Sequence, residues 1–346
     1  APQALYMAHG VTTTLDPSVS SDAFFPVAEL IRAGRVIGPR SYATGESLLP
    51  DAPQTGPANF AEAGELVRRR ADLGARSIKI FLTPRRDQRQ MLGEWARRLG
   101  LTATNEGGDL YYNVGSILDG HAGFEHPLHY MTLYRDAVEF FGRTGATYSP
   151  TLIVAGAGRW AEEYHKSRQD LWRDPIMRRF LPWQALALHR ESGVRPIEEY
   201  SFPIMAGNVA AIRAAGGHAT IGGHGELWGR DSHWEMWTYA AAADPYEVLA
   251  MATRDGAWML GLEREIGTIE PGKVADLVIL NADPLADIRN TTAIASVMIG
   301  GRLYDSPSLD RSWPSARPYG IPPWFDAGVL GLRREDTGTA AVGTRP

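Results

Sequence analysis

Apolar residues follow two spacings along the first 262 residues, and stretches of the two kinds alternate. Short β-branched or apolar runs are typical of buried strands, and they predict seven strands at residues 11–16, 40–44, 77–82, 101–105, 122–124, 146–154 and 218–223. Apolar positions three and four residues apart predict helices between them, for example at 22–33, 59–73, 88–99 and 133–143. Strands that alternate with helices form βα units and a parallel sheet. The pattern therefore predicts an α/β fold of the (β/α)8, TIM-like barrel type that is one strand short.

The alternation has one interruption and ends near residue 262. A Trp- and Arg-rich stretch at 155–203 exceeds the usual loop length, and we interpret it as a lid-like insertion in the barrel of residues 1–262. After this point apolar runs at 274–280 and 295–304 predict a small β-sandwich portion at 263–305. The remaining residues, 306–346, are rich in Pro, Gly and Trp and predict an extended tail.

Composition narrows the class of protein. The chain has 346 residues, of which 44% are apolar and 22% charged, so it can bury a sizeable core. A net charge of −5 argues against a nucleic-acid partner, and no apolar run of about 18 residues predicts a membrane span. The chain has no cysteine, which excludes disulfides, thiolate metal ligands and a cysteine nucleophile.

Candidate chemistry gathers at residues 119–129, which contain three of the nine histidines. His121 and His126 flank the predicted strand 122–124. Reactive groups of α/β barrels lie at strand ends, because strands are rigid and the loops that follow them can vary. The alternative is that these histidines make ordinary hydrogen bonds within a loop.

A second signal is Lys79, in the middle of the apolar strand 77–82. A buried ammonium is costly unless it is paired or chemically altered. A salt bridge to Glu106 or Asp16 would explain Lys79 without any catalytic role. Glu106 and His224 themselves stand at the ends of predicted strands, where they would face the same barrel mouth.

A long motif near the C-terminus resembles a known family. It consists of Ala252-Thr253, Ala257, Leu260-Gly261-Leu262, Gly267-Thr268-Ile269-Glu270-Pro271-Gly272-Lys273 and Ala275-Asp276-Leu277-Val278-Ile279-Leu280. In this order the segments resemble the C-terminal signature of the amidohydrolase superfamily, the metal-dependent hydrolases related to imidazolonepropionase and metal-dependent prolidases. The tips Glu106-Gly107-Gly108 and Gly223-His224-Gly225, with the run 84–90, further resemble the branch often fused behind a TolB-like β-propeller.

The resemblance implies a (β/α)8 barrel with a small β-sandwich and a metal site at the carboxyl ends of the barrel strands. Lys79 matches the family's fourth-strand lysine, which is often carboxylated, and His126 matches the sixth-strand histidine. Glu106 and His224 take the positions of the fifth-strand histidine and the eighth-strand aspartate. The implied metal ligands, for zinc or a similar divalent ion, are Lys79, Glu106, His126 and His224, with Glu106 and His224 also in catalysis.

The implied activity is hydrolysis of an amide bond by metal-activated water, in a small molecule or a short peptide of dipeptide or cyclic-amide type. Arg85 and Arg86 are candidate groups for a substrate carboxylate, with His121 as a further substrate contact. Exposed, solvated charge is the alternative for both arginines.

Besides the substitutions at Glu106 and His224, the sequence departs from the family in a further respect. No His-x-His occurs in it, and the seven predicted strands begin at what would be the second barrel strand. We therefore expect a complementing N-terminal segment, or a second copy of the chain in a homo-oligomer, to supply the missing strand and ligands. The alternative function is a non-catalytic remnant that serves binding or assembly.

Overall fold

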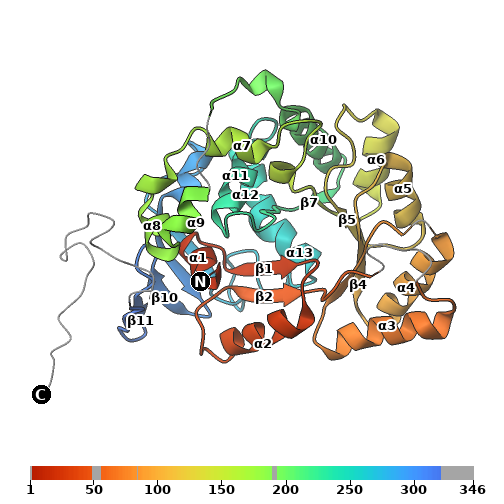
Figure 1. Cartoon of the computed structure of the whole chain (residues 1–346), viewed down its shortest axis with the longest axis horizontal. Helices are drawn as coiled ribbons and strands as arrows, with labels where there is room; N and C mark the ends of the chain where they lie inside the picture. The colour runs from red at the N-terminus through yellow and green to blue at the C-terminus, as the bar shows by residue number, and fades with distance from the viewer. Residues whose placement is uncertain (1, 49–55, 84, 189–192, 321–346) are drawn as a thin grey trace, which may run out of the picture.

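Seven short strands form the parallel part of the fold, as the alternation predicted. The computed structural model describes residues 2–48, 56–83, 85–188 and 193–320 (Figure 1). The parallel strands are β1 (Thr13–Asp16), β2 (Arg40–Ala43), β3 (Ser77–Ile80), β4 (Thr102–Glu106), β5 (Gly123–Glu125), β6 (Thr147–Ser149) and β7 (His218–Ala219). β1 pairs with β2, and β3 to β7 form a five-stranded sheet in sequence order. A parallel bridge between Leu48 and Ile80 joins the chain after β2 to β3.

The barrel is incomplete within the described residues. There, β1 has no strand neighbour other than β2, and β7 has none other than β6. This arrangement confirms the predicted fold class, an α/β barrel that is short of a strand, together with a separate antiparallel sheet. None of the described helices is long and apolar enough to cross a membrane.

Helices connect and cover the strands. They are α1 (Pro2–Ala8), α2 (Ser21–Arg32), α3 (Phe60–Asp72), α4 (Arg86–Arg98), α5 (Leu110–Leu118), α6 (Arg135–Arg143), α7 (Ala161–Lys166), α8 (Pro175–Phe180), α9 (Trp183–Leu188), α10 (Phe202–Ala214), α11 (Arg230–Tyr239), α12 (Pro245–Ala250) and α13 (Gly256–Met259). Asn59 caps α3 by accepting from the amides of Ala61 and Glu62. Between α12 and α13 the chain forms a π-helical turn (Met251–Asp255).

The parallel strands have one apolar face and one polar face. Ile78, Ile80 and Phe124 are buried in the layer between sheet and helices, where the ring centre of Phe124 lies 5.2 Å from that of Phe141 in α6. Side chains alternate between the two faces along a strand, so the residues next to apolar ones in the same strand point to the opposite face. These include Lys79, Thr104 and Glu125, which line the barrel interior.

The C-terminal sheet is antiparallel, in the order β11-β10-β9-β8. Its strands are β8 (Leu277–Leu280), β9 (Ile294–Ile299), β10 (Arg302–Asp305) and β11 (Arg311–Trp313). The run 295–304, which we expected to be one strand, is a β9–β10 hairpin that turns at Gly300 and Gly301, both with positive φ. Within the predicted tail from residue 306, β11 extends the sheet. Residues 321–346 lie outside the described part.

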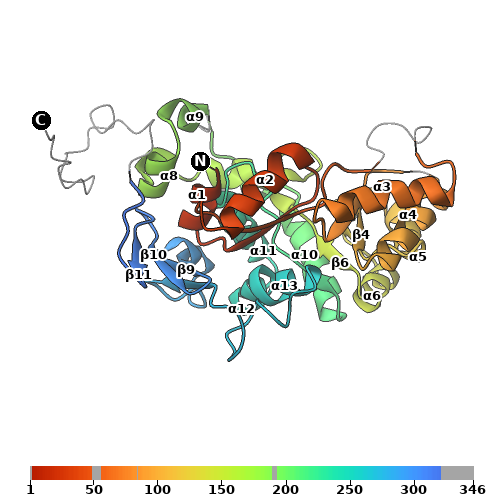
Figure 2. The ribbon, with the colours of Figure 1, turned by 90° about the horizontal axis from the view of Figure 1, so that it is seen from below.

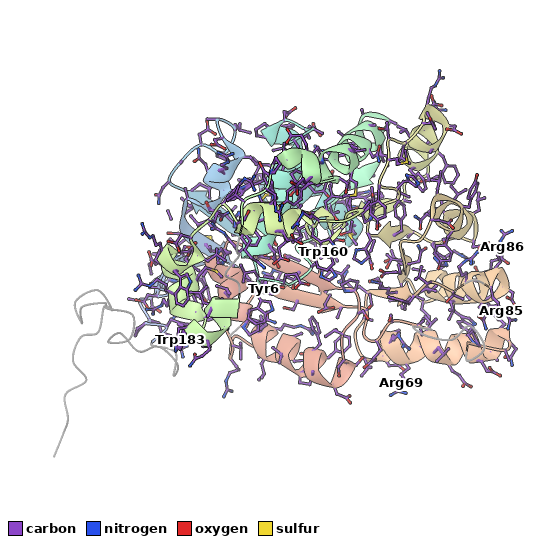
Figure 3. All side chains as sticks on the ribbon, turned by 45° about the horizontal axis from the view of Figure 1, so that its top comes forward. Tyr6, Arg69, Arg85, Arg86, Trp160 and Trp183 are labelled. Carbon is purple, nitrogen blue, oxygen red and sulfur yellow. The ribbon has the colours of Figure 1, made fainter. Side chains whose placement is uncertain are left out.

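The part of the insertion around α8 shares a core with α1 and the C-terminal sheet (Figure 2). Its buried residues Met177 and Phe180, in α8, share a core with Leu5 of α1 and Val297 of β9. Trp160 and Trp183 remain 44% and 47% exposed (Figure 3). This core connects α1, which the sequence did not predict, to the sheet more than 270 residues away. The role of the insertion as a lid stays a prediction.

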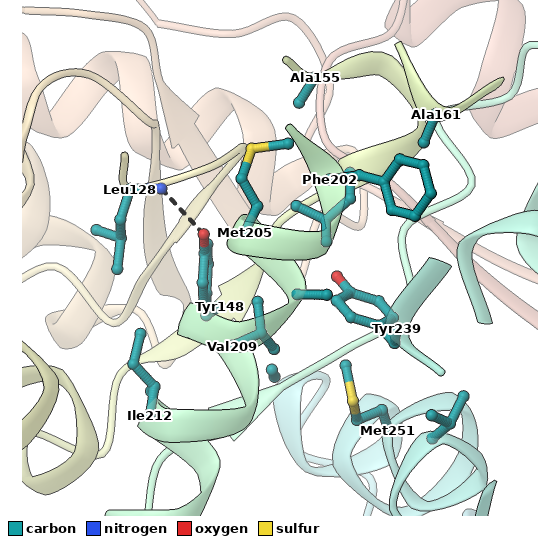
Figure 4. Close-up of a cluster of buried hydrophobic side chains, with 14 of the residues drawn as sticks. Leu128, Tyr148, Ala155, Ala161, Phe202, Met205, Val209, Ile212, Tyr239 and Met251 are labelled. Atoms are coloured by element: carbon teal, nitrogen blue, oxygen red, sulfur yellow. Dashed lines mark hydrogen bonds between the residues drawn. The ribbon is translucent and has the colours of Figure 1, made fainter. Parts of the chain in front are cut away.

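A hydrogen bond inside the main apolar core joins β6 to the loop after β5. The Tyr148 hydroxyl accepts from the Leu128 backbone amide at 2.9 Å, among Phe202, Met205 and Val209 (Figure 4). We expect Tyr148→Phe to lower the free energy of unfolding by about 1–3 kcal/mol, because it leaves a buried N–H without its acceptor. Urea denaturation measures the change. Tyr134→Phe is the control, since Tyr134 is 83% exposed and should change stability by less than about 0.5 kcal/mol. An equal effect of the two substitutions would contradict the prediction.

Candidate active site

A buried lysine and two glutamates meet inside the parallel sheet. Lys79 Nζ lies 2.6 Å from Glu106 Oε2 and 2.6 Å from Glu125 Oε2. The strand register produces this contact, because Lys79 pairs with Thr104 on β4 and Glu106 pairs with Glu125 on β5. The Thr104 hydroxyl completes the group by donating to Glu125 Oε1 at 3.0 Å.

The electrostatics of this group follow from burial and pairing. Burial lowers the pKa of Lys79, but Glu125 and Glu106 oppose it more strongly, and the net pKa of Lys79 is raised. Burial raises the pKa of Glu125, which is only partly offset by the Lys79 ammonium. Lys79 is therefore a stable cation that neutralises the less buried Glu106 carboxylate at the edge of the group.

His126 stands one residue beyond β5 and connects this group to the barrel mouth. Its Nε2 lies 3.1 Å from Glu106 Oε1, and its Nδ1 lies 2.6 Å from the Thr151 hydroxyl. Burial lowers the pKa of His126, and Glu106 opposes that effect. The backbone of His126 is left-handed, with φ 65°, which is uncommon for a residue other than glycine and turns the chain out of the strand.

His224 lies on the loop that follows β7 and faces His126. The two imidazole ring centres are 5.6 Å apart, and His224 Nδ1 lies 2.9 Å from Glu226 Oε1. The buried Asp231 at the start of α11 holds this loop, since its carboxylate accepts from the amides of Leu227 and Gly229. Burial raises the pKa of Asp231 to about 6, and the backbone amides that it binds act in the opposite direction.

Four residues chosen from the sequence thus converge at one place: Lys79, Glu106, His126 and His224. They come from β3, β4 and the segments just after β5 and β7, all at the carboxyl ends of parallel strands, where barrels hold their reactive groups. The convergence was expected from topology. The roles of the four residues as ligands or catalysts stay predictions.

The structure does not bring the predicted substrate contacts into this group. Arg85 pairs with Asp87, and Arg86 pairs with Asp119 (Figure 3). His121 lies before β5, at the opposite end of the strand from His126. It is 4% exposed, and its ring nitrogens contact Asn105 Oδ1 and the Arg89 carbonyl. Burial lowers the pKa of His121 to about 4, so it is a neutral structural group at neutral pH.

Sequence reasoning missed three neighbours of the site: Glu125, Thr151 and Glu226. Glu125 could have been found from the alternation of side chains along its strand. Phe124 is apolar and faces the helices, so the next residue, Glu125, faces the barrel interior, as Lys79 does. Glu226 follows His224 by two residues. Thr151 had no sequence signal, because it reaches His126 only through the loop after β6.

The site has donor atoms of the chemical type that zinc and similar divalent ions bind, but only a small number of them. Carboxylate oxygen and imidazole nitrogen are the ligands that such ions take, and Glu106, His126 and His224 provide them. In the described part of the chain, however, no group of three or more His, Cys, Asp or Glu side chains is placed so as to hold a metal ion. The fit is therefore that of a partial ligand set.

Comparison with known proteins supports the resemblance. The model of the amidohydrolase family matches residues 219–304. This part of the chain is similar to that family. It contains the His224 loop, α11 to α13 and most of the C-terminal sheet, which agrees with the signature seen in the sequence.

Similar proteins agree with this result. A 5-methylthioadenosine/S-adenosylhomocysteine deaminase of Symbiobacterium thermophilum is 53% identical over 38 residues, which are 11% of this chain and 9% of that protein. A Xaa-Pro dipeptidase structure with bound methionine superimposes with a TM-score of 0.67 at 18% identity, covering 88% of this chain and 77% of that one. The structure of molinate hydrolase gives 0.66 at 17% identity, covering 88% and 74%. At these identities the solved structures show the shared barrel fold.

Removal of the Lys79 charge should destabilise the protein in a pH-dependent way. We expect Lys79→Met to cost about 3–5 kcal/mol of unfolding free energy near pH 8, because it leaves buried carboxylates without their cation. In this variant the pKa of Glu125 is higher in the folded than in the unfolded chain. The variant therefore keeps its stability near pH 4.3, which is about the pKa of a glutamate in the unfolded chain, and loses stability as the pH rises.

Chemical denaturation at pH 5 and pH 8 measures this effect. The double variant Lys79→Met with Glu125→Gln should lose most of the extra pH dependence, because the titrating group is gone. Arg32→Met is the surface control. Arg32 pairs with Glu29, and their side chains are 75% and 63% exposed, so this pair should contribute less than about 1 kcal/mol to the free energy of unfolding. A cost of Lys79→Met that is the same at both pH values would show that Glu125 does not depend on Lys79.

Proposed function

We propose that this chain forms the barrel of a metal-dependent hydrolase that cleaves an amide C–N bond in a dipeptide or a cyclic amide. The observation that carries the proposal is the meeting of Lys79, Glu106, His126 and His224 at one mouth of the parallel strands. The similarity of residues 219–304 to the amidohydrolase family supports a hydrolase acting on C–N bonds. The dipeptide substrate class is suggested by the name of the Xaa-Pro dipeptidase that shares the fold.

In the proposed site, Glu106 and His126 would provide part of the ligand set of a divalent ion, zinc or a similar metal, and His224 would either add to that set or act as the base. Such an ion, when bound, lowers the pKa of its water and polarises the substrate carbonyl. Lys79 as an ammonium neutralises Glu106. A carboxylated Lys79 would instead add a third negative group beside Glu106 and Glu125, which requires the positive charge of the ion for balance.

His224 is suited to move the proton in this reaction. Its Nδ1 lies 2.9 Å from Glu226, so the carboxylate holds the Nδ1–H tautomer and Nε2 keeps its lone pair. The side chain of His224 is 41% exposed, so water and substrate can approach it. Where His224 does not bind the metal, its Nε2 would be free to accept a proton from the attacking water and return it to the leaving nitrogen.

The proposal predicts metal binding and hydrolysis that depend on both histidines. Purified protein should contain a divalent metal by elemental analysis and should release amino acids from a panel of Xaa-Pro dipeptides or open a panel of cyclic amides. His126→Asn and His224→Asn should lower kcat/KM by about 100-fold or more. His129→Asn is the matched control, because His129 is exposed and close in sequence but belongs to the loop beyond the site.

Two other results would point to a different function. A metal stoichiometry near zero and no hydrolysis, with the fold intact by circular dichroism, would favour the alternative of a non-catalytic binding or assembly domain. Release of ammonia from adenosine derivatives, with no cleavage of amides, would make the substrate an aminopurine rather than an amide.

A further inference from the structure

The hydroxyl of Tyr6 lies between the two edge strands of the barrel. Within the described residues, β1 pairs only with β2, and β7 pairs only with β6. From α1, Tyr6 reaches the loop after β7, where a Cβ added at Gly225 would meet its hydroxyl at 3.3 Å. On the other side, the charge of Asp16, the last residue of β1, acts on the same hydroxyl. Both neighbours belong to carboxyl ends of parallel strands, so Tyr6 reaches the barrel mouth beside His224.

α1 holds Tyr6 in this place without help from a ligand. Leu5 and Met7, its neighbours in sequence, are fully buried in the core that α1 shares with α8 and the C-terminal sheet. At the end of α1, the Ser306 hydroxyl donates to the Ala8 carbonyl at 2.7 Å. The phenol is therefore positioned before any molecule binds, which lowers the entropy that binding costs.

The Tyr6 hydroxyl is available as a hydrogen-bond donor. It makes no hydrogen bond to any residue in the described part of the chain. Burial raises the pKa of Tyr6 above its ordinary value, and the negative charges of Asp231 and Asp16 add to this effect. The phenol therefore keeps its proton at neutral pH and can donate it to an acceptor on a bound molecule.

The charges at the mouth favour an ammonium group over a carboxylate. The Asp16 carboxylate accepts from the Ser18 amide at 3.1 Å, and it has no ion-pair partner among the described residues. Lys79, the cation of the site, is already paired with Glu106 and Glu125. Apart from a bound metal ion, the residues named at this mouth leave no cation for a substrate carboxylate. A substrate ammonium group could instead pair with Asp16.

We propose that Tyr6 and Asp16 form the subsite that receives the amino end of the substrate. The Tyr6 hydroxyl donates to a neutral carbonyl oxygen, and the Asp16 carboxylate pairs with a free ammonium group. This inference rests on the proposed function and narrows it, because a lactam or an N-acylated peptide has no such group. The substrate class is then a dipeptide or an aminoacyl amide with an unblocked amino terminus.

Binding of alaninamide, which carries an ammonium group and a neutral carbonyl, tests the subsite whether or not the protein cleaves an amide. It is titrated into protein labelled with 3-fluorotyrosine, and the fluorine NMR signal of Tyr6 is assigned by its loss in Tyr6→Phe. This signal should shift on binding. N-acetylalaninamide should bind about tenfold or more weakly, and Asp16→Asn should weaken alaninamide binding to the same extent. Asparagine can keep the bond to the Ser18 amide while it removes the charge.

Hydrolysis tests the consequence for the substrate. The wild type should have a kcat/KM for alanyl-proline about tenfold or more above that for N-acetylalanyl-proline, and Asp16→Asn should remove most of this preference. Tyr6→Phe should lower kcat/KM for both peptides by about threefold to tenfold, the effect of one lost neutral hydrogen bond. Tyr134→Phe and Asp136→Asn are the matched controls, because both residues are exposed on the far side of the sheet, at the start of α6.

Several results would overturn the inference. They are a Tyr6 signal that alaninamide leaves unmoved, equal affinity for the acetylated probe, unchanged affinity in Asp16→Asn, and hydrolysis that Tyr6→Phe does not slow. Failure of the proposed function looks different. In that case alaninamide binds with the expected dependence on Asp16, but the wild type cleaves neither peptide.

Discussion

The arrangement of the site depends on the pairing of Lys79 with Glu106 and Glu125. An ammonium inside a parallel sheet is tolerated only where carboxylates surround it, and here the register of three adjacent strands delivers them. Because Lys79 draws Glu106 inward, the second oxygen of Glu106 is left to face His126. The charge balance of the barrel interior and the orientation of the mouth are thus consequences of one ion-paired group.

β5, β6 and β7 end before His126, Thr151 and His224, so these residues lie on loops. A loop keeps a fixed position only where other parts of the protein bind its backbone. α11 supplies this support with two buried carboxylates one turn apart, Asp231 for the loop of His224 and Glu235 for the turn after Thr151. Gly223 shows how close this support lies, because a Cβ at that position would meet Asp231 Oδ1 at 2.7 Å. The helix therefore acts as a common base for segments that are about 70 residues apart in the chain. Thr151 and His224, in the two segments that α11 holds, both have a left-handed backbone.

A second apolar core joins α1, the insertion, α11 and the C-terminal sheet, which the parallel sheet does not connect. Leu5 and Met7 of α1 pack with Phe180 of α8, Trp234 of α11 and Val297 of β9. The insertion at 155–203 and the C-terminal sheet are in this way tied to the start of the chain and to the helix that supports the site. Burial of these apolar side chains contributes roughly 1.5–3 kcal/mol each, which is enough to make this second core part of the folding unit.

The sequence by itself determined the order of the seven strands and the convergence of Lys79, Glu106, His126 and His224. Both follow from short-range periodicity and from the rule that parallel strands present their carboxyl ends at one edge. It also indicated the similarity to the amidohydrolase family, because the motif that carries it is local. Only the tertiary structure decided the partners of these residues. Glu125 became the second counter-ion of Lys79 through strand register, and Thr151 met His126 because α11 holds the turn beside it. The sequence could not place α1, β11 or the insertion either, because their positions are set by packing between segments far apart in the chain, and such packing leaves no periodic trace in any one of them.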